Sequence, residues 1–143
     1  MKKIMKLVCT CFLVLSLSAC VEAIEDTNGE NNTSLNTITL PKYYARHEEL
    51  SLSSAIALQT INVHPENEYF KSVDGVLYSI DGKELVCYPR NKVSSSFETL
   101  STTNIIREYA FYGNSNLKDV VIGNNIIAIS TNAFDMTKLT SVE

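Results

Sequence analysis

The residues of this chain whose types could support covalent catalysis are one cysteine and two histidines. Cys87 could attack a substrate carbonyl if His47 or His64 removed the proton from its thiol. The cysteine lies, however, in the apolar run Leu-Val-Cys-Tyr at residues 85–88, where a cysteine usually acts as a small hydrophobic residue. The sequence has no glycine-rich phosphate loop, Gly-x-Ser-x-Gly turn, paired-carboxylate motif or zinc-ligand spacing. We therefore expect a protein that is not an enzyme and holds no metal or cofactor.

A different cysteine chemistry, lipid attachment, is indicated at Cys20. Residues 1–6 carry three lysines and no acid, an apolar run covers residues 7–15, and Leu-Ser-Ala directly precedes Cys20. This order is typical of a secretory signal, and the apolar run is too short to span a bilayer as a stable helix. The Leu-Ser-Ala-Cys sequence resembles the lipobox of bacterial lipoproteins, which implies cleavage of residues 1–19 and a lipid on the Cys20 thiol. The alternative is an ordinary signal peptide in which Cys20 is incidental.

The chain that would remain after cleavage is acidic. Loss of the three lysines leaves 9 basic and 16 acidic residues, a net charge of −7. An acidic chain without a basic stripe argues against nucleic acid as a partner and against electrostatic docking to anionic lipid. Cys9 and Cys11 lie in the signal, so Cys87 would have no internal disulfide partner. The expected contact with the membrane is the lipid on Cys20.

After Cys20 the composition changes from a linker to a folded domain. Residues 20–39 are rich in acidic residues, asparagine, threonine and serine, with too little apolar surface to offset the entropy of ordering. They predict a disordered, lipidated tether. Residues 40–143 are long enough for one domain with a modest core.

The folded part repeats itself with a period in the low twenties. Residues 106–111 (Ile-Arg-Glu-Tyr-Ala-Phe) match residues 129–134 (Ile-Ser-Thr-Asn-Ala-Phe), and residues 117–122 match residues 139–142. Residues 58–63 (Leu-Gln-Thr-Ile-Asn-Val) form an earlier copy. This period and the Leu-x-x-apolar-x-apolar pattern indicate a leucine-rich-repeat solenoid, in which each unit buries its apolar face against its neighbours. The core is expected to include Leu117, Val120, Ile122, Ile127, Ile129 and Phe134.

These motifs resemble, in their order, the BspA-type leucine-rich repeats of bacterial surface proteins. The segment at about 68–90 is similar to a hairpin insertion of that family, with strands at 70–79 and 85–89 flanking Asp81-Gly82, a type I′ turn signal. The resemblance implies an α/β leucine-rich-repeat solenoid, rich in β-strand with short helical turns. It also implies a place in the bacterial cell envelope, at the outer membrane or cell surface.

Alternation along the strands predicts a binding face. If the apolar residues at every second position are buried, the residues between them are exposed. In repeat register these form the candidate face Thr60, Asn62, His64, Asp119, Val121, Ser141 and Glu143. The alternative is an ordinary solvated face that carries one stray valine.

The resemblance implies adhesion to host or matrix proteins or to other cells, with a protein or glycan as ligand. The alternative function is a structural scaffold facing the periplasm, which docks a partner at the C-terminal repeat edge. That alternative rests on the last strand-like segment, which no polar cap follows although repeat arrays usually carry one.

Overall fold

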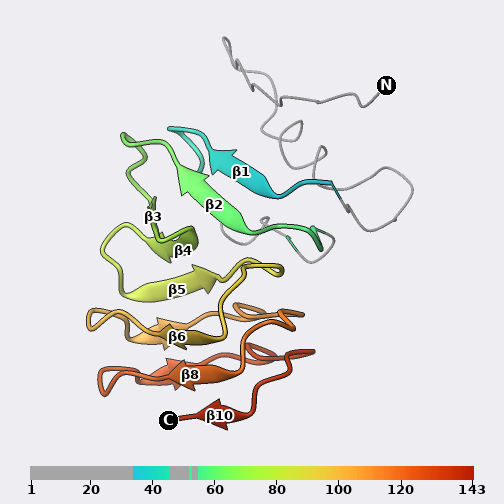
Figure 1. Cartoon of the computed structure of the whole chain (residues 1–143). Coiled ribbons are helices and arrows are strands. Elements are labelled where there is room, and N and C mark those ends of the chain that lie inside the picture. The colour runs from blue at the N-terminus through green and yellow to red at the C-terminus, as the bar shows by residue number, and fades with distance from the viewer. Residues whose placement is uncertain (1–33, 46–51, 53–54) are drawn as a thin grey trace, which may run out of the picture.

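The structure is a computed structural model that describes residues 34–45, 52 and 55–143, and this part of the chain winds into a stack of β-coils (Figure 1). Its strands are β1 (Thr37–Leu40), β2 (Thr60–Val63), β3 (Phe70–Val73), β4 (Val76–Ser79), β5 (Glu84–Cys87), β6 (Ser96–Glu98), β7 (Ile105–Ile106), β8 (Asp119–Val121), β9 (Ala128–Ile129) and β10 (Ser141–Val142). The prediction of a β-rich solenoid is confirmed. The described ranges form turns but no helix, so the predicted short helical turns are not confirmed.

The strands form three sheets. Strands β6, β8 and β10 make a parallel sheet, in which Asp119 of β8 pairs with Ser96 on one side and Ser141 on the other. Strands β5, β7 and β9 are also parallel, with Leu85 opposite Ile106. They continue into the antiparallel strands β4 and β3, and β1 pairs with β2 in a separate parallel sheet.

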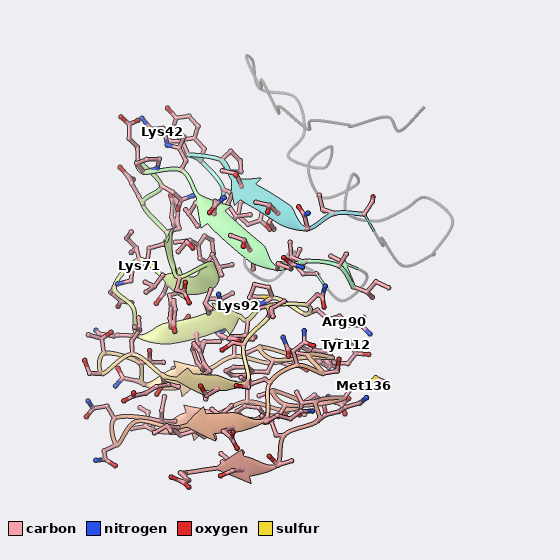
Figure 2. All side chains as sticks on the ribbon, viewed as in Figure 1. Lys42, Lys71, Arg90, Lys92, Tyr112 and Met136 are labelled. Atoms are coloured by element: carbon pink, nitrogen blue, oxygen red, sulfur yellow. The ribbon has the colours of Figure 1, made fainter. Side chains whose placement is uncertain are left out.

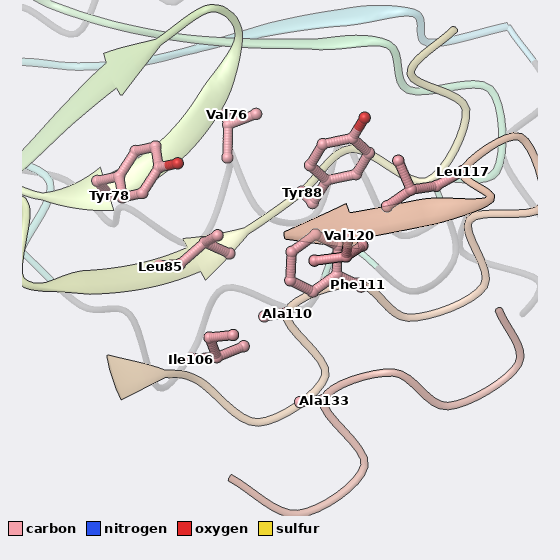
Figure 3. Packing of buried hydrophobic residues seen from close by; sticks show 10 residues of the cluster. All are labelled: Val76, Tyr78, Leu85, Tyr88, Ile106, Ala110, Phe111, Leu117, Val120 and Ala133. Atoms are coloured by element: carbon pink, nitrogen blue, oxygen red, sulfur yellow. The ribbon is translucent and has the colours of Figure 1, made fainter. Parts of the chain in front are cut away.

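A row of aromatic rings links successive coils in the core. Phe111 stacks between Tyr88 and Phe134, with ring centroids 5.1 and 4.7 Å away. The backbone is in the same register, because Tyr88 N donates to Ala110 O and Phe111 N donates to Ala133 O. Figure 3 shows Tyr88 and Phe111 among the aliphatic side chains of this cluster. Cys87-Tyr88 therefore occupies the position of Ala110-Phe111, and the coil that starts at Cys87 is a repeat absent from the sequence prediction.

The predicted core is correct in part. Leu117 and Val120 are fully buried, and Ile122 and Phe134 are partly buried against the same cluster. The prediction was wrong for Ile127, which is 82% exposed, and for Ile129, which is 49% exposed. Ile126, not Ile127, packs against the core at the start of this coil. Ile129 lies on β9, which among the described strands pairs on one side only, with β7.

A buried asparagine closes the turn between β7 and β8. Asn114 Nδ2 donates to Pro89 O of the preceding coil at 2.8 Å, and Asn114 Oδ1 accepts the N–H groups of Asn116 and Leu117 at 3.0 and 2.9 Å. The side chain thus joins two coils and also shapes its own turn. Because the Asn114 side chain is fully buried, water cannot replace any of these hydrogen bonds if one is lost.

The same device recurs between β2 and β3. Asn67 Nδ2 donates to Pro41 O and Tyr44 O at 2.8 and 3.0 Å, while its Oδ1 accepts from the N–H groups of Tyr69 and Phe70. The turn after β2 therefore matches the turn after β7. Along the chain, an asparagine turn comes after β2 and after β7. Strand β8 instead begins after such a turn.

The β3–β4 hairpin connects two hydrophobic clusters. Val76 and Tyr78 of β4 pack into the cluster around Phe111, and Leu77 packs into the cluster around Ile61. All three side chains are buried, so β4 is covered on both faces. The insertion is part of the core and joins the N-terminal coils to the later ones.

The predicted hairpin at Asp81-Gly82 is present, since β4 and β5 pair antiparallel across it, but the predicted type I′ turn was wrong. The left-handed pair is Asp74-Gly75, with φ of 49° and 73°, and it joins β3 to β4 with Val73 opposite Val76. At the second turn only Gly82 is left-handed, and Asp81 instead accepts hydrogen bonds from Ser79 Oγ and Lys83 N. The segment therefore contains three strands where two were expected.

The start of the folded part lies earlier than the predicted boundary at residue 40, because β1 begins at Thr37. The signal, Cys20 and residues 20–33 of the tether lie outside the described residues. Within the described ranges, no helix has the length and apolar character needed to cross a membrane.

We predict that Asn114→Ala destabilises the protein by about 3 kcal/mol, because it removes a buried hydrogen bond to Pro89 O and leaves the N–H groups of Asn116 and Leu117 without their acceptor. Urea unfolding of the full chain measures the change. Asn124→Ala, at an exposed position, is the control and should change the unfolding free energy by less than about 0.5 kcal/mol. Equal effects of the two substitutions would contradict the role given to Asn114.

Candidate functional site

The candidate site is the outer face of the parallel sheet β6-β8-β10. Two rows of side chains cross it, one from each outward position of the strands. We define the sheet face by these two rows: Ser96, Asp119 and Ser141, and Glu98, Val121 and Glu143. The side chains between the rows, Phe97 and Val120, point into the core cluster.

Backbone hydrogen bonds fix the spacing of the second row. Val121 pairs with Glu98 in register, and Glu143 continues β10 by donating its N–H to Val120 O and accepting from Ile122 N. Val121 therefore lies between two glutamates and is 44% exposed. Neighbouring parallel strands are about 4.8 Å apart, so the three residues form one short continuous row. Its centre is apolar and its ends are acidic.

The first row adds hydroxyl groups and a third carboxylate. Asp119 lies between Ser96 and Ser141, and Thr140 Oγ1 is 3.5 Å from Asp119 Oδ1. Both rows lie on strands whose backbones are hydrogen-bonded to the neighbouring strands of the sheet. The arrangement presents hydrogen-bonding and negatively charged groups on a rigid support. Such a support suits the binding of another molecule better than the making or breaking of covalent bonds.

The structure does not extend these rows to Thr60, Asn62 and His64. Strand β2 pairs with β1, so Thr60 lies opposite Thr37 and Asn62 opposite Thr39. His64 is exposed, and its Nδ1 accepts the N–H of Glu66. The apolar spacing of residues 58–63 is shared by strands of different sheets, and spacing alone did not separate them.

Ser96 and Glu98 were missing from the sequence prediction. Their strand β6 carries Phe97 at the position of Val120, and Ser94 stands three residues earlier, where the next coil has Leu117. Without that leucine the repeat pattern was not visible. The Cys87-Tyr88 pair, read as a variant of Ala-Phe, is the signal that could have revealed it.

Cys87 has the surroundings of a structural residue. It is partly buried and packs against the cluster around Ile61, and burial raises the pKa of its thiol to about 12. A nucleophilic cysteine requires a lowered pKa. His47, one of its two candidate bases, lies outside the described residues. No group of three or more potential metal ligands occurs in the described part of the chain.

Apolar side chains are also exposed along the last coil. The exposed members are Ile127, Ile129, Met136 and Val142. Ile129 and Val142 lie on β9 and β10, the outermost described strands of their sheets. This apolar edge is the place at which the alternative prediction put a docking partner.

Comparison with known proteins identifies the repeats. Residues 87–143 match the family described as BspA type leucine rich repeat region, in six copies. The crystal structure of the pneumococcal vaccine antigen PcpA is similar with a TM-score of 0.70 and 35% identity, covering 76% of this chain and 27% of that chain. A search of curated proteins gave no match.

Two further solved structures share the fold. A leucine-rich repeat protein from Eubacterium ventriosum has a TM-score of 0.65 and 23% identity, covering 76% of this chain and 32% of that one. A leucine rich cell surface protein from Faecalibacterium prausnitzii has a TM-score of 0.62 and 23% identity, covering 77% and 30%. The chain thus spans about a third or less of the length of each of these proteins.

We predict that iodoacetamide modifies Cys87 at pH 8 at least about a hundredfold more slowly in the native chain than in urea, because a pKa of about 12 leaves little thiolate. The native rate should rise with pH up to pH 10, as the thiolate fraction grows. Mass spectrometry of the full chain separates Cys87 from Cys9, Cys11 and Cys20. Equal native and denatured rates would show a reactive thiol and would reopen the enzyme hypothesis.

Proposed function

We propose, for a chain whose residues 87–143 are a BspA-type leucine-rich-repeat region, that it is a lipid-anchored protein of the bacterial surface. Its repeats bind a protein or glycan ligand, and its role is adhesion to host or matrix components or to other cells. The observation that carries the binding function is the sheet face, where carboxylates and hydroxyls surround the exposed Val121.

The charge of the sheet face favours a ligand with basic groups. Glu98, Asp119 and Glu143 contribute three carboxylates to the six residues of the face, and the sheet face itself contains no basic residue. Charge complementarity of this kind steers association and selects among partners. Val121 supplies the apolar contact at the centre, where water exclusion strengthens the surrounding polar contacts.

The proposed anchor rests on the sequence around Cys20. The basic residues, apolar run and Leu-Ser-Ala-Cys order fit a lipidated amino terminus. Two or three acyl chains hold a protein on a membrane far more firmly than one chain. The cell-surface location is supported by the kind of protein that the repeats resemble, since one structural neighbour is described as a cell surface protein.

We predict that Val121→Lys lowers ligand binding at least about tenfold, because it places a charge at the centre of the face and opposes basic ligand groups. The full chain is tested on immobilised matrix proteins and on a glycan array. Val93→Lys is the matched control, since Val93 is 78% exposed and lies outside the three strands of the face. Neither variant should change stability by more than about 0.5 kcal/mol. Binding that survives Val121→Lys would move the site away from the sheet face.

We predict that Cys20→Ala abolishes incorporation of labelled palmitate and releases the protein from the membrane fraction, because the acceptor thiol is lost. Protease treatment of intact cells then tests the location of the wild-type domain, with a periplasmic protein as the leakage control. Release of the repeat domain from unlysed cells is expected. Protection until the envelope is broken would favour the scaffold.

The exposed apolar edge favours that second candidate function. A chain docking on β9 and β10 would cover Ile129 and Val142 and extend both parallel sheets. This candidate requires association in solution through the edge. Val142→Lys should then abolish the association, and a monomeric wild-type chain would remove the reason for it.

A further inference from the structure

A cluster of aromatic, methionine and arginine side chains lies at the corner where each coil turns toward the sheet β6-β8-β10. We define the corner patch as Arg90, Tyr109, Tyr112, Asn132 and Met136. Figure 2 shows Arg90, Tyr112 and Met136 one below another along one edge of the stack. These three residues come from three successive coils. Tyr112 directly precedes Gly113, and Arg90, Gly113 and Met136 occupy equivalent positions 23 residues apart. The corner patch is separate from the sheet face.

Two of its residues have an unfavourable backbone conformation. Tyr109 and Met136 have φ of 57° and 55°, in the left-handed region that large side chains rarely adopt. The equivalent positions of the neighbouring coil hold Asn132 and Gly113, the residue types that tolerate this region. The fold therefore accepts an easier residue at each position. Tyr109 and Met136 are 48% and 63% exposed, so core burial does not account for them.

The side chains of the corner patch hold one another in place. The rings of Tyr109 and Tyr112 pack edge to face at 5.7 Å, and Tyr112 Oη donates to Met136 Sδ at 3.2 Å. Asn132 Nδ2 donates to Tyr109 Oη at 3.1 Å, and the Arg90 guanidinium carbon lies 5.5 Å from the centre of the Tyr112 ring. Ordering these residues on binding therefore costs little, which favours affinity.

Gly113 is required for this arrangement. A β-carbon at residue 113 would lie 2.5 Å from Arg90 Nε, so a larger residue would displace the guanidinium from Tyr112. Gly113 has no side chain and thus leaves room for Arg90. In the next coil, the equivalent left-handed position holds the exposed Met136. The contact between coils is built around surface side chains as well as the core.

The chemistry of the corner patch fits a protein ligand better than a sugar. Tyrosine, arginine and methionine are the types enriched at the centres of protein interfaces. The two rings are perpendicular and adjoin a flexible thioether, which gives an uneven and largely apolar surface. Such a surface accommodates an inserted side chain, since methionine adapts its shape to the group that it contacts.

We propose that the corner patch is a second binding surface, which takes an aromatic or branched aliphatic side chain of an extended peptide segment of a protein partner. It acts independently of the sheet face, on another side of the same coils. The left-handed residues Tyr109 and Met136 supply the exposed side chains that form the contact.

The test replaces each strained residue by the residue of the neighbouring coil. The double variant Tyr109→Asn, Met136→Gly keeps the backbone type at both positions, and its melting temperature should equal or exceed that of the wild-type chain. A display library of random 12-residue peptides is panned on the full chain and on this variant in parallel. Asp119→Asn, Val121→Thr on the sheet face is the control variant.

Peptides enriched on the wild-type chain should carry aromatic or branched aliphatic residues. They should bind the corner variant at least about tenfold more weakly and bind the sheet-face variant equally well. Equal enrichment on the wild-type chain and the corner variant would overturn the proposal. So would a glycan array on which the corner variant, but not the sheet-face variant, loses sugar binding, because the ligand would then be a glycan.

Discussion

The side chains of each coil in this protein are buried by the coils beside it. A single coil is too thin to enclose its own apolar residues, so its stability depends on a neighbour in exact register. Phe111 illustrates the dependence, because Tyr88 covers one face of its ring and Phe134 covers the other. Stacked aromatic pairs of this kind add about 0.5–1.5 kcal/mol beyond the burial of their area. The remaining features of the fold serve to keep the coils in this register.

Two kinds of polar contact maintain the register where the chain changes direction. Asn67 and Asn114 each bind carbonyls of the preceding coil and the N–H groups of their own turn. A partly buried ion pair between neighbouring coils also maintains the register, beside the parallel strands β5 and β7. Arg107 donates to Glu84 at 2.7 and 2.9 Å. These bonds compensate for backbone groups that the turns would otherwise leave unpaired. The turns are consequently as specific as the strands.

The division between interior and surface sets what the molecule can bind with. In the β3–β4 hairpin, Leu77 and Tyr78 are buried and join the two clusters, because Leu77 faces one cluster and Tyr78 the other. These side chains are therefore not exposed to a ligand. The sheet face and the corner patch remain, and both are supported by consecutive coils. A ligand on either surface would therefore contact side chains that are distant in sequence and fixed by the stacking. Repeat proteins commonly use extended surfaces of this kind.

The sequence alone determined that the chain contains a solenoid with a period in the low twenties. Ala110-Phe111 and Ala133-Phe134 recur at a constant distance, and the pairing of Asp119 with Ser141 followed from that distance. A short apolar repeat is a local property, so its existence and its spacing can be seen without coordinates. The same is true of the residues around Cys20, whose order predicts processing rather than structure.

Only the tertiary structure decided which strands share a sheet and which residues therefore share a face. Residues 58–63 and 117–122 have the same apolar spacing, yet β2 pairs with β1 while β8 pairs with β6 and β10. Strand β6 joined the sheet face although Ser94 replaces the repeat leucine, because Phe97 fills the core in register with Val120. Exposure of Ile127 and the left-handed backbone of Tyr109 depend on how one coil lies on the next. Sheet partners and solvent exposure arise from contacts between coils, and spacing within one coil does not specify those contacts.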